Sequence, residues 1–337
     1  MSLPLANTNR FPLTAADRDR WILARRPARN SVDPGRPAAF LIEDERSQSG
    51  EVVSVATVFL TNRECPWRCV MCDLWKNTTP EPVPPGAIPA QIDQALLGLA
   101  GALRPPRQIK LYNSGSFFDP GAVPVEDHAA IATRVRSFER VIVECHPALV
   151  GETALGFQER LEGQLEMAMG LETADPEVLP RLNKRMTLDQ FREAADFLRA
   201  AGIPLRVFIL VKPPFQAASE AVHWAKESLE FAFSCGATVA VLIPTRTGNG
   251  AMEALAADGD FSPPTLEMLE AAAGYGIGRT RCRVFADLWD VEKLQTCADC
   301  GQARRARLQR MNLSQQHQPP VSCARCGCGT ARPDAAE

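Results

Sequence analysis

The sequence has no hydrophobic run that is long enough to cross a membrane. A membrane-spanning helix needs about 18 or more consecutive apolar residues, and no window of the 337 residues approaches that length. Residues 1–30 also lack the apolar stretch of a secretory signal peptide. We therefore expect a cytoplasmic protein that has no membrane partner.

The chain is also short of histidine, and this bears on its first three cysteines. Cys65, Cys69 and Cys72 have the spacing CxxxCxxC and follow a strand-like apolar segment. A zinc knuckle here would need a fourth ligand nearby, but the next cysteine is Cys145 and the first of four histidines is His128. A ferredoxin-type carrier would show a full set of four cysteines, and disulfide frameworks belong to short secreted chains. Three thiolates favour an incomplete iron–sulfur site, in which one iron of a four-iron cluster stays free to bind a ligand.

The overall composition fits a protein with one large core and a small appended module. Hydrophobic residues make up 45% of the chain and charged residues 23%. Eleven cysteines without a secretion signal indicate metal or cluster ligands in a reducing compartment. The net charge of -3 conceals two arginine-rich segments, at residues 10–36 and 304–310. Such segments either bind an anionic partner or form solvated faces of surface helices.

Residues 50–285 alternate between short apolar, β-branched runs and longer segments with helical spacing. This alternation predicts parallel βα units. The clearest helix is 187–201, because Thr187 and Gln190 form a capping box and Gly202 can end it. A further helix is predicted at 14–26. The six predicted strands are 51–60, 108–113, 140–145, 165–172, 204–211 and 237–243, and the six helices are 89–103, 125–138, 152–163, 187–201, 217–234 and 264–274.

The cysteine spacing resembles the defining loop of the radical S-adenosylmethionine (SAM) superfamily, whose open iron chelates the amino and carboxylate groups of SAM. Six βα units also match the partial (β/α)6 TIM-like barrel of that superfamily, in which the active site forms at the C-terminal ends of the strands. The resemblance implies a [4Fe–4S] cluster, SAM, and an electron donor such as flavodoxin or ferredoxin. We expect an N-terminal extension at 1–48, the barrel at 49–286 and a Cys-rich metal-binding tail at 287–337.

The resemblance also implies roles for polar residues at the strand ends. Glu144 lies in a segment similar to the Glu-x-x-Pro of the Elongator catalytic subunit and the oxygen-independent coproporphyrinogen oxidases, and would face the cofactor. Superfamily members often have Gly-Gly-Glu after the second strand and an aromatic residue before the last cysteine, and this chain departs from both. The expected cofactor-binding residues are Met71 at the adenine, the backbone of Ser114 and Gly115 at the amino group, Glu144, Glu172 at the ribose, and Arg185 at the carboxylate with Lys184 as the alternative.

The loop after the sixth strand supplies the candidates for substrate binding. It reads Pro-Thr-Arg-Thr-Gly-Asn-Gly, an irregular polar loop at the predicted functional face of the barrel. Such loops often carry function. We expect Arg246 and Asn249 to face the substrate.

Two CxxC pairs in the tail are typical of a zinc ribbon. Cys297 and Cys300 are followed, after 22 residues, by Cys323 and Cys326. This gap is slightly longer than usual, so Cys328 or His317 could replace one ligand. A bound Zn²⁺ would supply folding energy that so short a tail cannot obtain from a core. An auxiliary iron–sulfur cluster and uncommitted cysteines remain as alternatives.

The nearest resemblance is to the family of the archaeosine synthase radical SAM subunit and its bacterial relatives, over residues 50–328. It is carried by CxxxCxxCDxW, NSGSFFDP, GLETxxPxVL with the following NKR, and the tail cysteines. It implies reductive cleavage of SAM to methionine and a 5′-deoxyadenosyl radical, in modification of a tRNA base. Two tyrosines and a net charge of -3 give RNA binding no independent support. The alternatives are a radical SAM enzyme for a small metabolite and a non-catalytic iron–sulfur electron-transfer or sensing protein.

Overall fold

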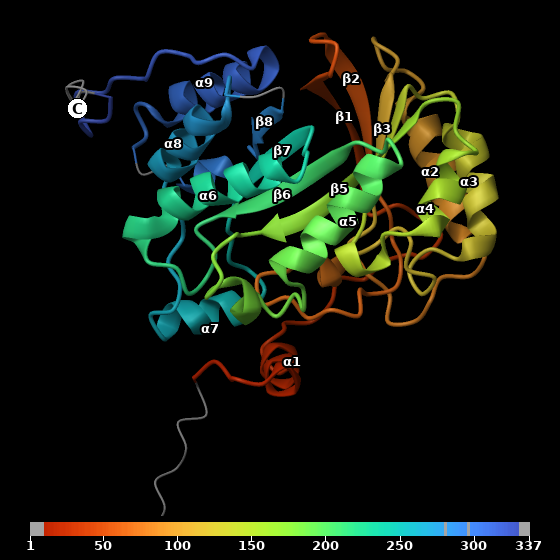
Figure 1. The fold of residues 1–337 in the computed structure, drawn as a ribbon, viewed down its shortest axis with the longest axis horizontal. Coiled ribbons are helices and arrows are strands. Elements are labelled where there is room, and N and C mark those ends of the chain that lie inside the picture. The colour runs from red at the N-terminus through yellow and green to blue at the C-terminus, as the bar shows by residue number, and fades with distance from the viewer. Residues whose placement is uncertain (1–9, 280–281, 295–296, 330–337) are drawn as a thin grey trace, which may run out of the picture.

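The computed structural model describes residues 10–279, 282–294 and 297–329, and its central element is one curled sheet of eight strands (Figure 1). The strands follow one another in chain order across the sheet. The first pair is antiparallel and every later pair is parallel. The strands are β1 (Ala39–Arg46), β2 (Val52–Phe59), β3 (Gln108–Tyr112), β4 (Arg140–Glu144), β5 (Gln164–Glu172), β6 (Leu205–Val211), β7 (Val239–Pro244) and β8 (Arg283–Ala286).

Helices connect the parallel strands and cover the outer face of the sheet (Figure 1). Those between strands are α2 (Ala87–Leu99), α3 (His128–Val135), α4 (Glu152–Gln158), α5 (Leu188–Ala200), α6 (Ala221–Ser234), α7 (Ala251–Ala257) and α8 (Leu266–Gly276), with α1 (Ala15–Leu23) before the sheet and α9 (Gly301–Ser314) after it. Short 3-10 helices lie at Leu74–Asn77, Val125–Asp127, Pro147–Leu149, Leu179–Leu182, Ala218–Glu220 and Val291–Leu294. Within the described residues, no helix has the length and apolar character needed to cross a bilayer.

The predicted partial barrel is confirmed, with both edges of the sheet extended beyond the prediction. Each of the six predicted strands and six helices has a counterpart, and the capping box of Thr187 and Gln190 is present. The sequence pattern did not predict β1, β8, α7 or α9. β1 contains Glu-Asp-Glu-Arg, a run that strand propensity disfavours, and β8 has only four residues.

The two faces of the sheet have different chemistry because side chains alternate along each strand. On the outer face, Val143, Met167 and Val207 are fully buried and belong to one core cluster with the helices. The alternate positions, such as Glu166 on β5 and Arg206 on β6, point to the inner, concave face and are also buried. The interior of this barrel is therefore charged at the end where the parallel strands begin.

An ion-pair network fills that end of the concave face. Arg206 pairs with Glu45 of β1 at 2.6 Å and with Glu166 of β5 at 2.7 Å. Lys110 of β3 pairs with Glu45 at 2.7 Å, and Arg140 of β4 with Glu166 at 2.6 Å. Burial alone would raise the pKa of Glu45, but the charges of Arg206 and Lys110 hold it well below the usual value. The network joins strands at opposite sides of the sheet and so favours its curvature.

Helix α9 covers the edge of β8 by means of two side-chain amides. The Asn312 amide accepts from the backbone N–H of Ala286 at 2.9 Å and donates to its carbonyl at 2.8 Å. Gln315 does the same with Val284, at 2.8 and 3.0 Å. These amides satisfy backbone groups that a neighbouring strand would otherwise pair. The tail helix is thus part of the edge of the barrel.

Replacing Arg206 with Met should lower the free energy of unfolding by about 3–5 kcal/mol, because Glu45 and Glu166 would stay buried without their shared partner. Urea denaturation at pH 7 measures this change. The contribution of Glu45 in the wild type should be complete above its ordinary pKa of 4.5 and be lost as the pH falls toward its lowered value.

The matched control is Arg136→Met. The ion pair of Arg136 with Glu162 is more than half exposed on both sides, so the loss should be below about 1 kcal/mol. Equal losses for the two variants would contradict a special role for the buried network.

Candidate active site and metal site

The loop that carries Cys65, Cys69 and Cys72 follows β2, at the edge of the sheet where the parallel strands end. All three side chains are free thiols of intermediate burial. Burial raises the pKa of each thiol to about 12. Without a metal these cysteines are therefore protonated at neutral pH, and a bound cation or cluster would have to supply the positive charge that holds them as thiolates.

Asparagine side chains from two other strand ends hold the backbone of this loop. Asn249, after β7, donates through Nδ2 to the carbonyls of Val70 at 2.8 Å and Cys72 at 3.0 Å. Asn183, after β5, donates to the carbonyl of Arg68 at 2.8 Å. Asn249 is only 2% exposed. It lies behind the cysteine loop, where it positions that loop, and not in the open position expected of a substrate ligand.

The N-terminal segment packs against the outer side of the loop. Glu64, one residue before the first cysteine, pairs with Arg26 at 2.6 Å and with Arg68 at 3.1 Å, and it also pairs with Arg29. Met71 is partly buried against a core cluster that includes Trp21 of α1. The predicted adenine contact of Met71 remains a prediction. The predicted N-terminal extension thus covers one side of the cysteine loop.

Of the two basic candidates after β5, Lys184 lies on the cysteine side. Its Nζ pairs with Glu172 at 2.6 Å, and both side chains are about nine-tenths buried. Burial alone would lower the pKa of Lys184, but the carboxylate of Glu172 and the nearby Cys69 raise it, so the ammonium stays charged. A Cβ on Gly170 would lie 2.3 Å from Oε1 of Glu172, so a larger residue there would displace this pair. Arg185, the first choice from sequence, instead pairs with Asp19 of α1.

The turn after β3 brings unsatisfied polar groups next to Cys65. Ser114 adopts a left-handed backbone conformation with φ of 54°, and a Cβ added to Gly115 would lie 3.2 Å from that of Cys65. Glu144 accepts from the backbone N–H of Asn113 at 3.1 Å, and burial raises the pKa of Glu144 to about 7. The side-chain amide of Asn113 is buried with no partner among the described residues. Such groups suit the binding of a polar ligand at this place.

A stacked ring pair beside the cysteines escaped the sequence analysis. Trp67, between the first two cysteines, stacks on His146 with ring centroids 3.9 Å apart and an interplanar angle of 13°. His146 accepts from the backbone N–H of Ala148 at 3.2 Å, while its Nε2 lies 3.1 Å from the carbonyl of Lys184. Burial lowers the pKa of His146 to about 4, so the ring is neutral. In the sequence, the only sign of a role for His146 was its place directly after a predicted strand.

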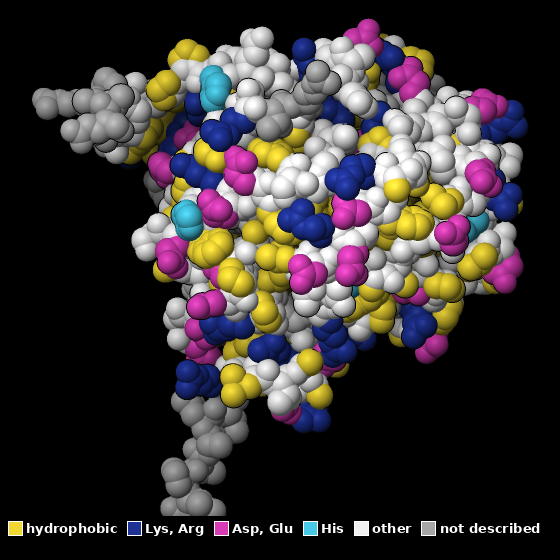
Figure 2. All heavy atoms as spheres, in the orientation of Figure 1, with side chains coloured by type: hydrophobic (Ala, Val, Ile, Leu, Met, Phe, Trp, Pro, Cys, Tyr) yellow, Lys and Arg dark blue, Asp and Glu magenta, His cyan; other side chains and the backbone are white. Residues whose placement is uncertain are grey.

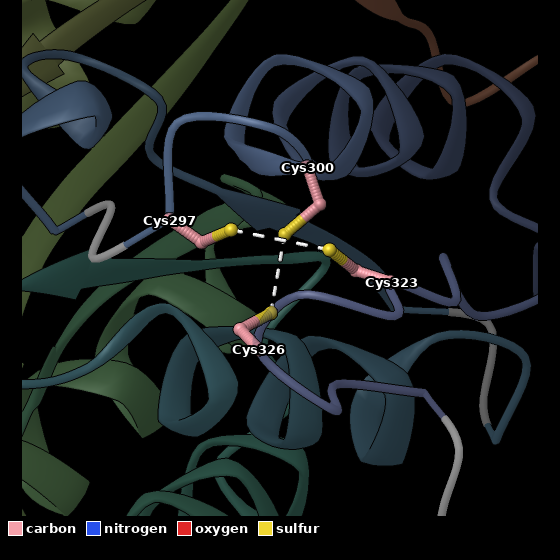
Figure 3. Close-up of side chains that lie close together, drawn as sticks. All are labelled: Cys297, Cys300, Cys323 and Cys326. Atoms are coloured by element: carbon pink, nitrogen blue, oxygen red, sulfur yellow. Dashed lines mark hydrogen bonds between the residues drawn. The ribbon is translucent and has the colours of Figure 1, made fainter.

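The tail cysteines converge on one point (Figure 3). The Sγ atoms of Cys297, Cys300, Cys323 and Cys326 lie within 4.8 Å of one another. The Cys297–Cys323 and Cys300–Cys326 distances are 3.9 and 3.7 Å, and Cys328 lies 3.5 Å from Cys300. Tetrahedral coordination with metal–sulfur bonds of about 2.3 Å separates the sulfurs by about 3.8 Å. These cysteines could therefore hold one metal ion.

Neither His317 nor the group of Cys65, Cys69 and Cys72 shares this geometry. His317 is exposed and lies near Gly278, outside the tail group. Cys65, Cys69 and Cys72 do not form a second group with the 4.8 Å spacing among the described residues. A wider spacing is what a multinuclear cluster requires, because each cysteine binds a different iron.

Comparison with known proteins gives relatives in sequence and in fold. No family model matches the chain. It is 22% identical to the Methanocaldococcus jannaschii protein MJ0550 over 306 residues, or 85% of this chain and 84% of that protein. It is 26% identical to archaeosine synthase subunit beta of Methanosarcina acetivorans, over 65% of each chain. The same subunit from Thermococcus kodakarensis is 30% identical over 42% of this chain and 46% of that subunit.

Two solved structures share the fold. The archaeal Methanocaldococcus infernus Elp3 has a TM-score of 0.50 and 13% identity, with 66% of this chain and 59% of that chain covered. Methylornithine synthase (PylB) has a TM-score of 0.50 and 15% identity, with 75% and 68% covered. The chain spans less than two thirds of the two archaeosine synthase subunits. The expected resemblance to the radical SAM superfamily and to this subunit is confirmed.

Asn249→Asp should loosen the cysteine loop. Aspartate keeps an oxygen that can accept from the backbone N–H of Met252, as Asn249 does at 2.8 Å, but it cannot donate to the carbonyls of Val70 and Cys72. Backbone amides of residues 69–73 should therefore exchange with deuterium about ten times faster in metal-free protein. Gln309→Glu, at an exposed side-chain amide of α9, is the control, and unchanged exchange in Asn249→Asp would refute the positioning role.

Proposed function

We propose that this chain, a radical SAM enzyme by resemblance in sequence and fold, binds a [4Fe–4S] cluster through Cys65, Cys69 and Cys72 and cleaves SAM there. One observation carries the proposal. Three half-buried thiols, spaced too widely for a single ion, lie on a loop that Asn183 and Asn249 fasten to two other strand ends. When bound, the cluster would supply the electron that cleaves SAM to methionine and a 5′-deoxyadenosyl radical, which abstracts hydrogen from the substrate.

The neighbouring residues supply groups for the polar parts of SAM. Lys184 is favoured over Arg185 as the carboxylate ligand, because Lys184 lies beside Cys69 whereas Arg185 lies beside Asp19 of α1. The backbone after β3 and the acidic side chain of Glu144 would meet the amino group, and Glu172 the ribose. The unpartnered amide of Asn113 would gain a hydrogen bond from this ligand or from water it orders. An external donor such as flavodoxin or ferredoxin would provide the electron.

For the substrate we propose a base in tRNA, by analogy with the archaeosine synthase subunits. Basic side chains support this choice, since Lys and Arg gather over the end of the molecule that carries α1 and α7 (Figures 1 and 2). Arg20 of α1 and Arg185 beside it are exposed, and a polyanion binds such a surface well. The likeness of fold to methylornithine synthase keeps a small metabolite as the second candidate.

For the tail we propose a structural Zn²⁺. The sulfur–sulfur distances of 3.5–3.9 Å suit one tetrahedral ion. An auxiliary four-iron cluster would bind each cysteine through a different iron and needs wider spacing. Cys326 and Cys328 compete for the position opposite Cys300, so one of them completes the set of four.

Single cysteine variants should separate the two metal sites. Alanine at Cys65, Cys69 or Cys72 should abolish the brown absorbance of anaerobically reconstituted protein and leave zinc at about one per chain. Cys297→Ala should remove the zinc and keep the iron. Metal analysis of each purified variant measures both. Cys235→Ala, at an isolated buried cysteine, is the control. Iron loss from both sets would point to an auxiliary cluster instead.

Reconstituted enzyme given SAM and a strong reductant should form 5′-deoxyadenosine, which chromatography detects. Lys184→Met should reduce this yield about tenfold or more, because it removes the cation proposed for the carboxylate. No product from the wild type would favour the electron-transfer or sensing alternative. Separately, deletion of the gene should change the nucleoside profile of host tRNA. An unchanged profile would move the proposal to the small-metabolite substrate.

A further inference from the structure

We propose that Trp289 is a stacking platform for a nucleobase of the RNA substrate, held in place by Arg246. The proposal rests on the tRNA substrate proposed above and extends it to a specific binding element. Trp289 lies just after β8, and Arg246 lies just after β7. Both therefore sit at the same edge of the sheet as the cysteine loop, since the two strands are parallel to β2.

The indole of Trp289 is unusually exposed for this protein. Among the described residues only two phenyl or indole side chains are exposed, Trp289 at 61% and Phe40 at 40%. Phe40 is packed against a helix, because a Cβ on Gly98 of α2 would lie 2.6 Å from its ring. A single exposed apolar residue carries little meaning by its exposure alone. What distinguishes Trp289 is how its backbone is held and which residues surround it.

Two side chains, those of Asp287 and Arg246, fix the backbone of Trp289. Its N–H donates to Oδ1 of Asp287 at 2.9 Å, and its carbonyl accepts from Nη2 of Arg246 at 2.7 Å. The same guanidinium pairs with Asp287. A rigid backbone lowers the entropy lost when a ligand stacks on the ring. The exposed indole thus extends from a backbone that is already fixed before a ligand binds.

One short segment connects Arg246 to the cysteine loop. Arg246 is three residues before Asn249, whose amide donates to the carbonyl of Cys72 at 3.0 Å. Between them, the carbonyl of Gly248 accepts from Lys76, which follows the cysteines. A ligand stacked on Trp289 would therefore lie along the rim that carries the cluster site, beside the Arg246–Asp287 ion pair.

These surroundings favour a nucleobase over an apolar protein partner. An exposed aromatic ring that stands among charged residues matches single-stranded RNA, in which bases stack on such rings. A protein interface would need a contiguous apolar patch, and the neighbours Arg246, Asp287 and Asp290 are charged.

Trp289→Ala should weaken binding of tRNA about five- to a hundredfold, the effect typical of losing one stacked base. The probe is tRNA from cells that lack the gene, titrated into reconstituted protein without SAM, so that no turnover occurs. Trp289→Phe should lose less affinity, because phenylalanine can still stack. Leu97→Ala, which removes a 79% exposed apolar side chain from α2, is the matched control and should bind as the wild type does. Quenching of tryptophan fluorescence by tRNA should also be weaker in Trp289→Phe than in the wild type.

An unchanged affinity in Trp289→Ala would overturn the platform while leaving the proposed enzyme and its tRNA substrate intact. Loss of self-association in that variant, at unchanged tRNA affinity, would assign the ring to a protein contact and would likewise overturn it. Failure of the wild type to bind tRNA would remove both the RNA substrate and the platform. Formation of 5′-deoxyadenosine would still stand as a separate test of the enzyme.

Discussion

Burying charge on the concave face of a curled sheet is the constraint on which the rest of this structure depends. Arg206 is 2% exposed, and an ion so far from water must have partners to remain charged. Glu166 comes from the neighbouring strand, but Glu45 comes from β1, at the far edge of the sheet. The antiparallel first strand is thus needed to complete the network, and the contact between β1 and β6 requires the sheet to curl. The curl in turn brings the ends of the parallel strands together around the cysteine loop.

Where the parallel strands begin, most buried charged groups have hydrogen-bond partners, with Nη2 of Arg283 as an exception. There, the buried ions Arg206, Lys110 and Glu45 are paired at 2.6–2.7 Å. At the mouth, the Asn113 amide has no partner among the described residues, and Glu144 has a pKa raised to about 7 by burial. Folded proteins rarely leave buried polar groups unsatisfied, and they do so most often where a ligand binds. Asn113 and Glu144 thus favour a polar ligand at the mouth on grounds that do not depend on the cysteine motif.

Local features of the fold could be predicted from sequence, whereas contacts between distant segments could not. The capping box of Thr187 and the six apolar strands depend on neighbours in the chain, so their signals are local. β1 gave no strand signal because its acidic residues serve an ion-pair network whose partners lie more than sixty residues away. The sequence does not reveal that the amide of Asn249, expected to face the substrate, reaches the backbone of Val70. It also does not reveal that Arg185 pairs with Asp19, for the same reason.

Contacts of α9 with β8 and α8 join the tail to the barrel. The proposed zinc would therefore support the barrel as well as the fold of the tail. Cys297 and Cys300 lie at the start of α9, whose last turn carries Asn312 and whose C-cap is Gln315. Those two amides pair with the outer edge of β8, and near the start of α9, Arg304 pairs with Glu267 and Glu270 of α8. A metal ion that fixes the start of α9 therefore also fixes β8. Because Trp289 follows β8 by three residues, the tail would support this side of the mouth of the barrel.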